Sequence, residues 1–266
     1  MGDETKQTAR PRRSVAAGIG RSMRLYHGDA ARATRMDALY ARFLRPGALA
    51  FDIGAHVGDR TAAFRRLGAR VVAVEPQPAA LRALRLVHGR DDGVTLVGSA
   101  IGAAAGRARL HVNVANPTVS TLSAAFVAAA AGADGWRGER WESEADVEVI
   151  PLDALIAAHG RPALVKIDVE GMEAEALAGL SQALPALSFE VTTIRRAAAL
   201  GAVRRLAELG RYRFALSLGE SFELPGDWTD APGIAARIRA LPHAANSGDI
   251  YALRDGVELV PAGAAG

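Results

Sequence analysis

Short apolar runs alternate with stretches of helical periodicity along most of this chain. The runs at 49–51 and 71–74 flank a segment whose apolar residues Val57, Phe64 and Leu67 fall on one helical face. The sequence therefore predicts strand, helix and strand in that order. The same alternation continues further along the chain and predicts an α/β protein with a doubly wound sheet. Further strands of this sheet are predicted at 94–97, 163–167, 187–191, 212–217 and 250–253.

Four segments between these runs follow a different pattern. Residues 107–114 alternate between apolar and polar side chains, and residues 146–150 alternate again. Such alternation is typical of half-exposed strands, so we predict that the two segments pair as an antiparallel hairpin. The long segment 115–145 is expected to be a functional lid or a mobile loop. An irregular excursion rich in proline and glycine is predicted at 219–247.

The pattern indicates a single domain over residues 17–257. Its first part, 17–46, is predicted to be helical and to precede the sheet. Residues 1–16 are expected to be a disordered basic tail, and residues 258–266 a loose C-terminal tail. Much of the basic excess lies in the first 45 residues. A solvated tail and helix account for it, with weak attraction to an anionic membrane or substrate as the alternative.

Composition excludes several classes of function. The 266 residues contain no cysteine, which rules out disulfides, thiolate metal sites and cysteine nucleophiles. Aromatic residues are only 5% of the chain, too few for a module that stacks many bases or sugars. The net charge of +3 creates no strong field, so no nucleic-acid partner is expected. No apolar segment reaches the ~18 residues that span a bilayer, and no secretory signal is present, so a cytoplasmic protein is expected.

The stretch 50–77 has the features of a nucleoside-binding unit. Asp52 ends the first apolar run, Gly54 and Gly58 follow it, and Glu75 ends the second run. Glycine lets the backbone approach a ligand closely, and a helix start offers free N–H groups. A carboxylate at the end of the second strand can accept two ribose hydroxyls. The glycine spacing is G-x-x-x-G and not the dinucleotide G-x-G-x-x-G, which favours a cofactor without a pyrophosphate over a nicotinamide dinucleotide.

Four motifs together resemble the FkbM family of S-adenosylmethionine-dependent methyltransferases. They are DIGAHVGDRT, VVAVEPQPAALRAL, the STL at 120–122 and LVKIDVEGMEAEALAG. The resemblance covers about residues 48–195 and extends more loosely to 254. It implies a class I methyltransferase (Rossmann-like) fold, with about seven mostly parallel strands and an antiparallel last strand. It also implies O-methylation of a hydroxyl on a saccharide, glycolipid or polyketide-type natural product.

The resemblance further implies a set of cofactor-binding residues. Asp52, Gly54 and Gly58 would hold the methionine end of S-adenosylmethionine, and Glu75 its ribose. Ser99 and Ala100, after the third strand, would flank the adenine. The family more often has asparagine where this chain has His56, so the role of this histidine is left open. The full expected set is Asp52, Gly54, His56, Gly58, Thr61, Glu75, Pro76, Ser99, Ala100 and Asp168.

Carboxylates at later strand ends are the candidates for chemistry. Asp168 and Glu170 are two residues apart, so on an extended strand they share a face at the edge where α/β sheets bind ligands. A carboxylate there could take the proton of an acceptor hydroxyl. Alternatively, Asp168, Glu170 and Glu190 could hold Mg²⁺ or another divalent cation that acidifies the hydroxyl. A purely structural role, such as a helix cap or a pair with Lys166, is the third possibility. Ser120, Thr121 and Glu190 are expected to contact the substrate.

The expected partner is a small-molecule or glycan hydroxyl acceptor. Three alternatives remain open at this level. The first is a non-catalytic protein that binds S-adenosylmethionine or a partner. The second is a nicotinamide-dependent oxidoreductase, which the glycine spacing disfavours. The third is a nucleic-acid methyltransferase, although no N-P-P-Y-like motif follows the fourth strand. The acceptor, the choice between O- and N-methylation, and the oligomeric state do not follow from the sequence.

Overall fold

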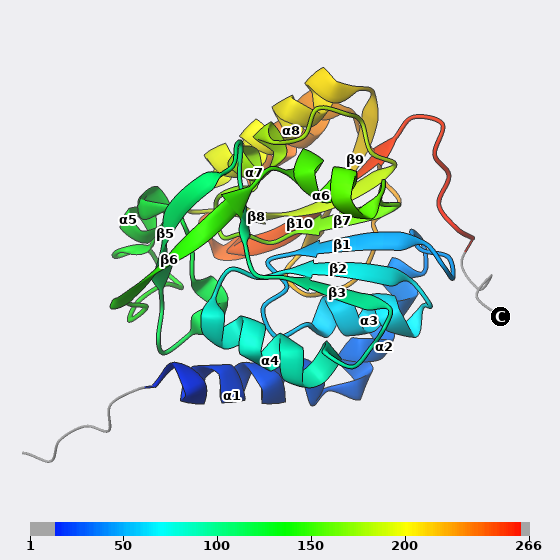
Figure 1. Ribbon diagram of the computed structural model, residues 1–266. Coiled ribbons are helices and arrows are strands. Elements are labelled where there is room, and N and C mark those ends of the chain that lie inside the picture. Colours follow the sequence, from blue (N-terminus) through cyan, green and yellow to red (C-terminus); the bar gives the residue numbers. More distant parts are fainter. Residues whose placement is uncertain (1–13, 262–266) are drawn as a thin grey trace, which may run out of the picture.

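The computed structural model describes residues 14–261, and the central element of this part is one large sheet (Figure 1). Within the described residues this sheet has seven strands in the order β3-β2-β1-β7-β8-β10-β9. The last strand, β10, is antiparallel to both its neighbours, and the other pairs are parallel. This topology confirms the predicted class I methyltransferase sheet. The strands are β1 (Leu49–Ile53), β2 (Arg70–Val74), β3 (Val94–Val97), β7 (Leu164–Ile167), β8 (Ala186–Thr192), β9 (Tyr212–Leu218) and β10 (Ser247–Arg254).

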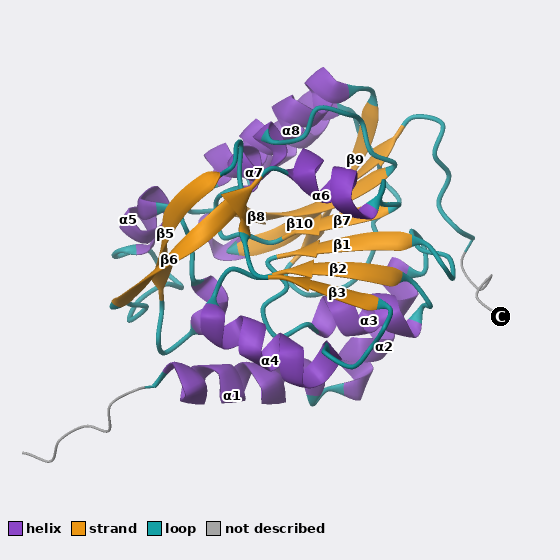
Figure 2. Ribbon diagram, in the orientation of Figure 1, coloured by secondary structure: helices purple, strands orange, loops and turns teal. Residues whose placement is uncertain are grey.

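Helices cover both faces of the sheet, as Figure 2 shows. Because successive side chains of a strand point to opposite faces, the continuously apolar strands supply two separate cores. On one face, Phe51 and Val165 pack with the helices that follow the later strands. On the other face, Ala50 and Leu164 pack with the earlier helices. The first layer contains α6 (Leu152–His159), α7 (Glu173–Ala178), α8 (Arg196–Leu209) and α9 (Ala231–Ala240), and the second contains α2 (Ala30–Tyr40), α3 (Asp59–Arg66) and α4 (Pro78–His88).

A smaller sheet stands beside the carboxyl edge of the large one. Strand β5 (Gly106–Val112) pairs antiparallel with β6 (Ser143–Ile150), which confirms the predicted hairpin, and β4 (Ala100–Ile101) pairs parallel with β6. The connection between β5 and β6 contains the 3-10 turn η1 (Pro117–Val119) and helix α5 (Ala124–Ala130). Its rings pack together, with Trp136 edge-on to Phe126 at 5.1 Å between centroids. Much of this connection is therefore packed structure and not an open loop.

The two ends of the domain differ from the sequence prediction. Helix α1 (Val15–His27) begins inside the segment 1–16 that was predicted to be disordered, because Ser14 caps it by accepting a hydrogen bond from Ala17 N. Residues 1–13 lie outside the described residues. At the other end, Val260 is buried and its N–H donates to the carbonyl of Arg42 over 2.8 Å. The described part of the predicted loose tail is therefore fixed to the domain, and residues 262–266 lie outside the description.

The structure also contains a helix where the sequence predicts irregular structure. The proline- and glycine-rich excursion contains helix α9 and the 3-10 turn η2 (His243–Ala245). Asp230 caps α9 by accepting from Gly233 N over 2.9 Å. Among the described helices, none combines the length and the apolar composition needed to cross a membrane.

Candidate functional site

The carboxyl edge of the parallel strands carries the predicted site. Register places Asp52 of β1 beside Lys166 of β7, and Glu190 of β8 beside Asp249 of β10. Asp168 and Glu170 follow β7 directly. Two cavities open along this edge and share four lining residues. The shared residues are Gly54, His56, Thr118 and Asp168.

The first cavity, with an empty volume of about 570 Å³, contains most of the predicted cofactor residues. Its lining combines backbone and side-chain polar groups near β1 and β2 with an apolar wall from the small sheet and the loop after β7. The predicted residues found there are Gly54, His56, Glu75, Pro76, Ser99, Ala100 and Asp168. Asp52 lines only the second cavity. Gly58 and Thr61 line neither of these two cavities. They contact the loop between β1 and α3 and the helices beside it.

Glu75 fixes the loop on which the first cavity is built. Its Oε2 accepts a hydrogen bond from His56 N over 2.8 Å, and its Oε1 accepts one from Gln77 N over 2.6 Å. Burial raises the pKa of Glu75 to about 7, although the two backbone donors oppose that shift. The carboxylate therefore joins two chain segments and still lines the cavity, where it has lone pairs left for a ligand.

Asp52 has a supporting position in β1. Its Oδ2 accepts from the Thr61 hydroxyl over 2.6 Å, and both residues are buried. Burial raises the pKa of Asp52 to about 6, and the Thr61 hydrogen bond counteracts this. The hydrogen bond ties the end of β1 to helix α3 and so sets the path of the loop between them.

Two glycines of this loop are required by geometry. Gly54 has φ of +79°, and a Cβ there would overlap the carbonyl oxygen of Asp168. Gly58 has φ of +84°, and a Cβ would meet Leu84 Cδ2 at 2.6 Å and the ring of His88 at 2.8 Å. Both positions need a left-handed backbone that only glycine adopts without strain, and both also need the missing side chain. Gly54 thus allows the end of β1 to lie against the backbone that follows β7, and Gly58 allows α4 to pack against the loop.

His56 also has a left-handed backbone, with φ of +48°. Its ring lies at the junction of the two cavities, with Nε2 3.4 Å from the Thr118 hydroxyl and the ring edge-on to Tyr26. Burial lowers the pKa of His56 to about 4, so the imidazole is neutral near pH 7. A neutral ring at this point can accept or donate one hydrogen bond to a bound group.

The second cavity has an empty volume of about 960 Å³ and is lined largely by charged groups. Lys166 is buried below it and donates to Asp249 Oδ1 over 2.6 Å, with Asp168 Oδ2 at 3.5 Å. This bears out the expected pairing of Lys166 with a carboxylate. Asp168 remains 28% exposed and faces both cavities, so it stands where a group held in one cavity meets a group held in the other.

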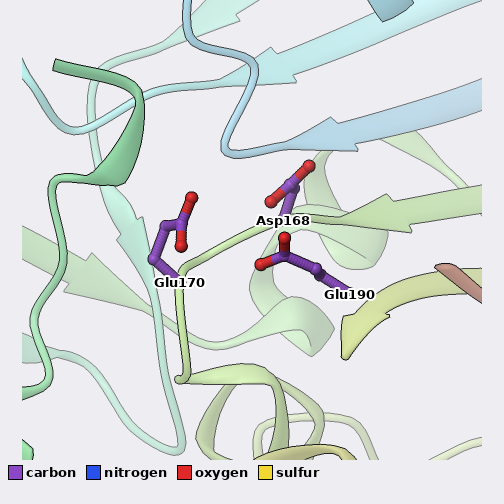
Figure 3. Close-up of side chains that lie close together, drawn as sticks. All are labelled: Asp168, Glu170 and Glu190. Carbon is purple, nitrogen blue, oxygen red and sulfur yellow. The ribbon is translucent and has the colours of Figure 1, made fainter. Parts of the chain in front are cut away.

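Asp168, Glu170 and Glu190 converge beside the second cavity (Figure 3). Each offers one carboxylate oxygen, and these oxygens all lie within 4.8 Å of one another. Burial, reinforced by the neighbouring acids, raises the pKa values of Glu170 and Glu190 well above their usual range. The Oε2 atoms of Glu170 and Glu190 are buried, and within the described part of the chain neither has a hydrogen-bond partner. The set has the donor chemistry of a cation site.

Ser120 and Thr121 line the first cavity and not the second. The Ser120 hydroxyl accepts from Gln77 Nε2 over 2.8 Å. The Thr121 hydroxyl donates to the carbonyl of Glu170 over 2.7 Å and holds that residue at φ of +52°. The third residue predicted to contact substrate, Glu190, does line the second cavity.

Sequence reasoning missed a buried charged network at the rim of the second cavity. Arg32 donates to Asp59 Oδ2 over 2.6 Å and to Glu220 Oε1 over 2.8 Å. Arg60 donates to the same two carboxylates over 2.9 and 3.3 Å. The adjacent Asp59 and Arg60 after the glycine loop were visible in the sequence. Their partners lie 27 and 160 or more residues away, so no local pattern identifies them.

A family model and several solved structures are similar to this chain. The family model described as "Methyltransferase FkbM domain" matches residues 52–214. No curated protein sequence matches the chain. Among solved structures, a TehB-like SAM-dependent methyltransferase from Corynebacterium glutamicum is similar, with 10% identity, 90% of this chain and 96% of that chain covered, and a TM-score of 0.47.

Two further structures are similar to this chain. Precorrin-6y C5,15-methyltransferase from Geobacter metallireducens has 15% identity, coverages of 83% of this chain and 87% of that chain, and a TM-score of 0.45. A putative O-methyltransferase from Klebsiella pneumoniae has 11% identity, and the match covers 90% of this chain and 90% of that chain with a TM-score of 0.43.

The family model spans well over half of the chain and includes the glycine loop, Glu75 and the segment around Asp168. The chain therefore belongs to the FkbM family of S-adenosylmethionine-dependent methyltransferases.

Proposed function

We propose that this protein methylates a hydroxyl of a small polyhydroxylated acceptor, with a saccharide as the preferred class and a glycolipid or polyketide-type product as related ones. The observation that carries the proposal is the position of Asp168. It lines both the cavity that contains the predicted cofactor residues and a second, polar cavity. A methyl group presented from the first cavity and a hydroxyl presented from the second would meet beside this carboxylate.

The residues of the first cavity fit S-adenosylmethionine. Glu75 offers carboxylate oxygens to the ribose hydroxyls, and Gly54 allows the methionine end to approach the backbone. The apolar wall, which includes Ile101, Leu110 and Met172, suits the flat adenine ring. When bound, the cofactor supplies an electrophilic methyl group on a sulfonium centre. The chain's own residues would orient it toward Asp168.

Asp168 is proposed to orient the acceptor hydroxyl and to receive its proton. The new bond joins the hydroxyl oxygen to the methyl carbon as the bond from that carbon to sulfur breaks, and the proton passes to Asp168 Oδ. Lys166, 3.5 Å from Oδ2 and held by Asp249, fixes the position of this carboxylate. Such positioning of reacting groups supplies a large share of the rate enhancement in enzymes.

A divalent cation such as Mg²⁺ is the second candidate for activating the hydroxyl. It is favoured by the convergence of Asp168, Glu170 and Glu190, whose oxygens match the ligands that hard cations take. These three residues would hold it, and it would act as a Lewis acid on the hydroxyl. Loss of methyl transfer in EDTA, restored by Mg²⁺, would support the cation. Unchanged transfer in EDTA would leave Asp168 as the acting group.

The proposed function is tested by separating cofactor binding from turnover. Asp168→Asn is expected to lower kcat at least about 100-fold, as loss of a general base commonly does. Its affinity for S-adenosylmethionine, measured by calorimetry, should change less than about threefold, since the methyl donor has its main contacts elsewhere. Methyl transfer is measured with labelled donor over a panel of saccharides, glycolipids and polyketides. The exposed Glu175→Gln provides a control for loss of one carboxylate.

Two results would contradict the proposal. Normal turnover of Asp168→Asn would remove this residue from the mechanism. The cofactor assignment itself would be removed if calorimetry detected no binding of S-adenosylmethionine or S-adenosylhomocysteine to the folded protein, and none to Glu75→Ala.

A further inference from the structure

The second cavity has an unequal balance of charged groups. Carboxylates outnumber basic side chains around it, and the imbalance persists after the visible ion pairs are assigned. The acidic lining residues are Asp52, Asp59, Asp168, Glu170, Glu190, Glu220 and Asp249, and the basic ones are Arg60 and Lys166.

Both basic side chains of the lining already have carboxylate partners. Arg60, together with Arg32 behind it, pairs with Asp59 and Glu220, which makes a set of two positive and two negative groups. Lys166 pairs most closely with Asp249, at 2.6 Å. Among the described residues that line the cavity, no basic side chain is therefore left to pair with the other carboxyl groups.

Three of these carboxyl groups, those of Asp168, Glu170 and Glu190, form one cluster. Within residues 14–261, no arginine or lysine forms a salt bridge with Glu170 or Glu190, and Asp168 has only the 3.5 Å contact with Lys166. Glu170 is 7% exposed, and its Oε2, like that of Glu190, is buried without a partner. Buried carboxylate oxygens of this kind are costly unless a donor or a cation satisfies them. A ligand that brings a cationic hydrogen-bond donor to these oxygens would therefore be stabilised in the cavity.

We propose that a protonated amine of the acceptor itself binds to the oxygens of Asp168, Glu170 and Glu190. The acceptor is then an amino sugar and not a neutral or phosphorylated sugar. This inference rests on the proposed function and specifies its substrate class. An ammonium donates along tetrahedral directions, which places three acceptors at hydrogen-bond distance about 4.6 Å from one another. The three carboxylate oxygens all lie within 4.8 Å of one another, close enough for one ammonium group to reach all three.

The surroundings favour an ammonium over a divalent ion. The buried Lys166 ammonium lies 3.5 Å from Asp168 and would repel a doubly charged ion more than a singly charged one. A phosphate or carboxylate on the acceptor would meet Asp168 and further carboxyl oxygens here, without a basic side chain of the described lining left to pair with it. A hydroxyl elsewhere on the same sugar would then reach Asp168 for methylation.

The test uses the full-length protein saturated with S-adenosylhomocysteine. Calorimetry at pH 7 compares the methyl glycosides of glucosamine, N-acetylglucosamine and glucose, and also glucose 6-phosphate. The glucosamine glycoside is expected to bind at least tenfold more tightly than the others, with EDTA present throughout. Glu190→Gln, which keeps the side-chain shape, should lose at least tenfold in this affinity while it binds S-adenosylhomocysteine normally. Glu175→Gln makes the same change at an exposed site and should alter neither affinity.

Equal affinities for the amine and neutral glycosides, tighter binding of the phosphate, or no binding of the glucosamine glycoside would each overturn the inference. In a parallel series, Mg²⁺ replaces EDTA. An amine preference that appears only in that series would overturn the inference in favour of the metal. Locating the labelled methyl group by mass spectrometry keeps the two proposals apart. Methyl on oxygen without an amine preference overturns only the ammonium site. Methyl on nitrogen with the preference overturns O-methylation and supports the cation-binding cluster.

Discussion

Gly54→Ala tests the contact that joins the glycine loop after β1 to the segment that carries Asp168. Gly54 has φ of +79°, and an added Cβ would overlap the carbonyl oxygen of Asp168. Gly47 has nearly the same φ, +80°, with no atom within 4 Å of an added Cβ. The two alanine variants therefore share the backbone strain, roughly 1–2 kcal/mol for a left-handed alanine. They also share the gain from a stiffer unfolded chain. Only Gly54→Ala adds the steric overlap.

The overlap should add roughly 1–3 kcal/mol, the usual cost of forcing extra volume into a packed site. Gly54→Ala should thus lower the free energy of unfolding by at least about 1 kcal/mol more than Gly47→Ala, measured by urea denaturation. Because relief of the overlap moves Asp168, turnover should also fall about 100-fold, whereas Gly47→Ala should keep normal turnover. Equal losses of stability, together with normal turnover of Gly54→Ala, would refute the role assigned to this contact.

Two further predictions concern pH and the buried ion network. Burial raises the pKa of Glu75 to about 7, and ribose hydroxyls donate best to the ionised form, so S-adenosylhomocysteine affinity should rise about tenfold from pH 6 to pH 8. Calorimetry should show this rise in the wild type and a flat profile in Glu75→Gln, and a flat wild-type profile would contradict it. Arg32→Ala should cost about 3 kcal/mol in urea denaturation, because it removes one partner of the buried Asp59. The more exposed pair of Arg66 and Asp37 provides the comparison, and Arg66→Ala should cost less than about 1 kcal/mol.

The strands and the edge they form could be predicted from the sequence because two independent signals coincide. Apolar runs of strand length end in Asp52, Glu75 and Asp168, and parallel strands bring their carboxyl ends to one edge. The hydrophobic pattern therefore predicts that these carboxylates lie at the same edge of the sheet. The hairpin was equally predictable, since β5 and the middle of β6 (144–149) alternate between polar and apolar residues.

Elements determined by distant contacts could not be predicted in this way. Helix α9 is a different case: the prediction of irregular structure there was wrong for a local reason, because Asp230 and Pro232 form a recognisable helix start beside Gly233. The partner of Arg32 in the ion network, Glu220, is 188 residues away. Whether Ser120 would face the cofactor or the acceptor depended on the packing of the loop after β5. No periodicity encodes such choices.

The motifs that identify the family are better understood as one structural unit than as separate fingerprints. Gly54 must lack a side chain because the Asp168 backbone lies against it, and Asp168 N donates to the carbonyl of Ile53 over 2.9 Å. Glu75 in turn holds His56 N, which fixes the same loop from the side of β2. Three strand ends therefore constrain one another at the junction of the two cavities. A change at any of them is expected to alter the geometry between methyl donor and acceptor, even where the residue changed contacts neither ligand.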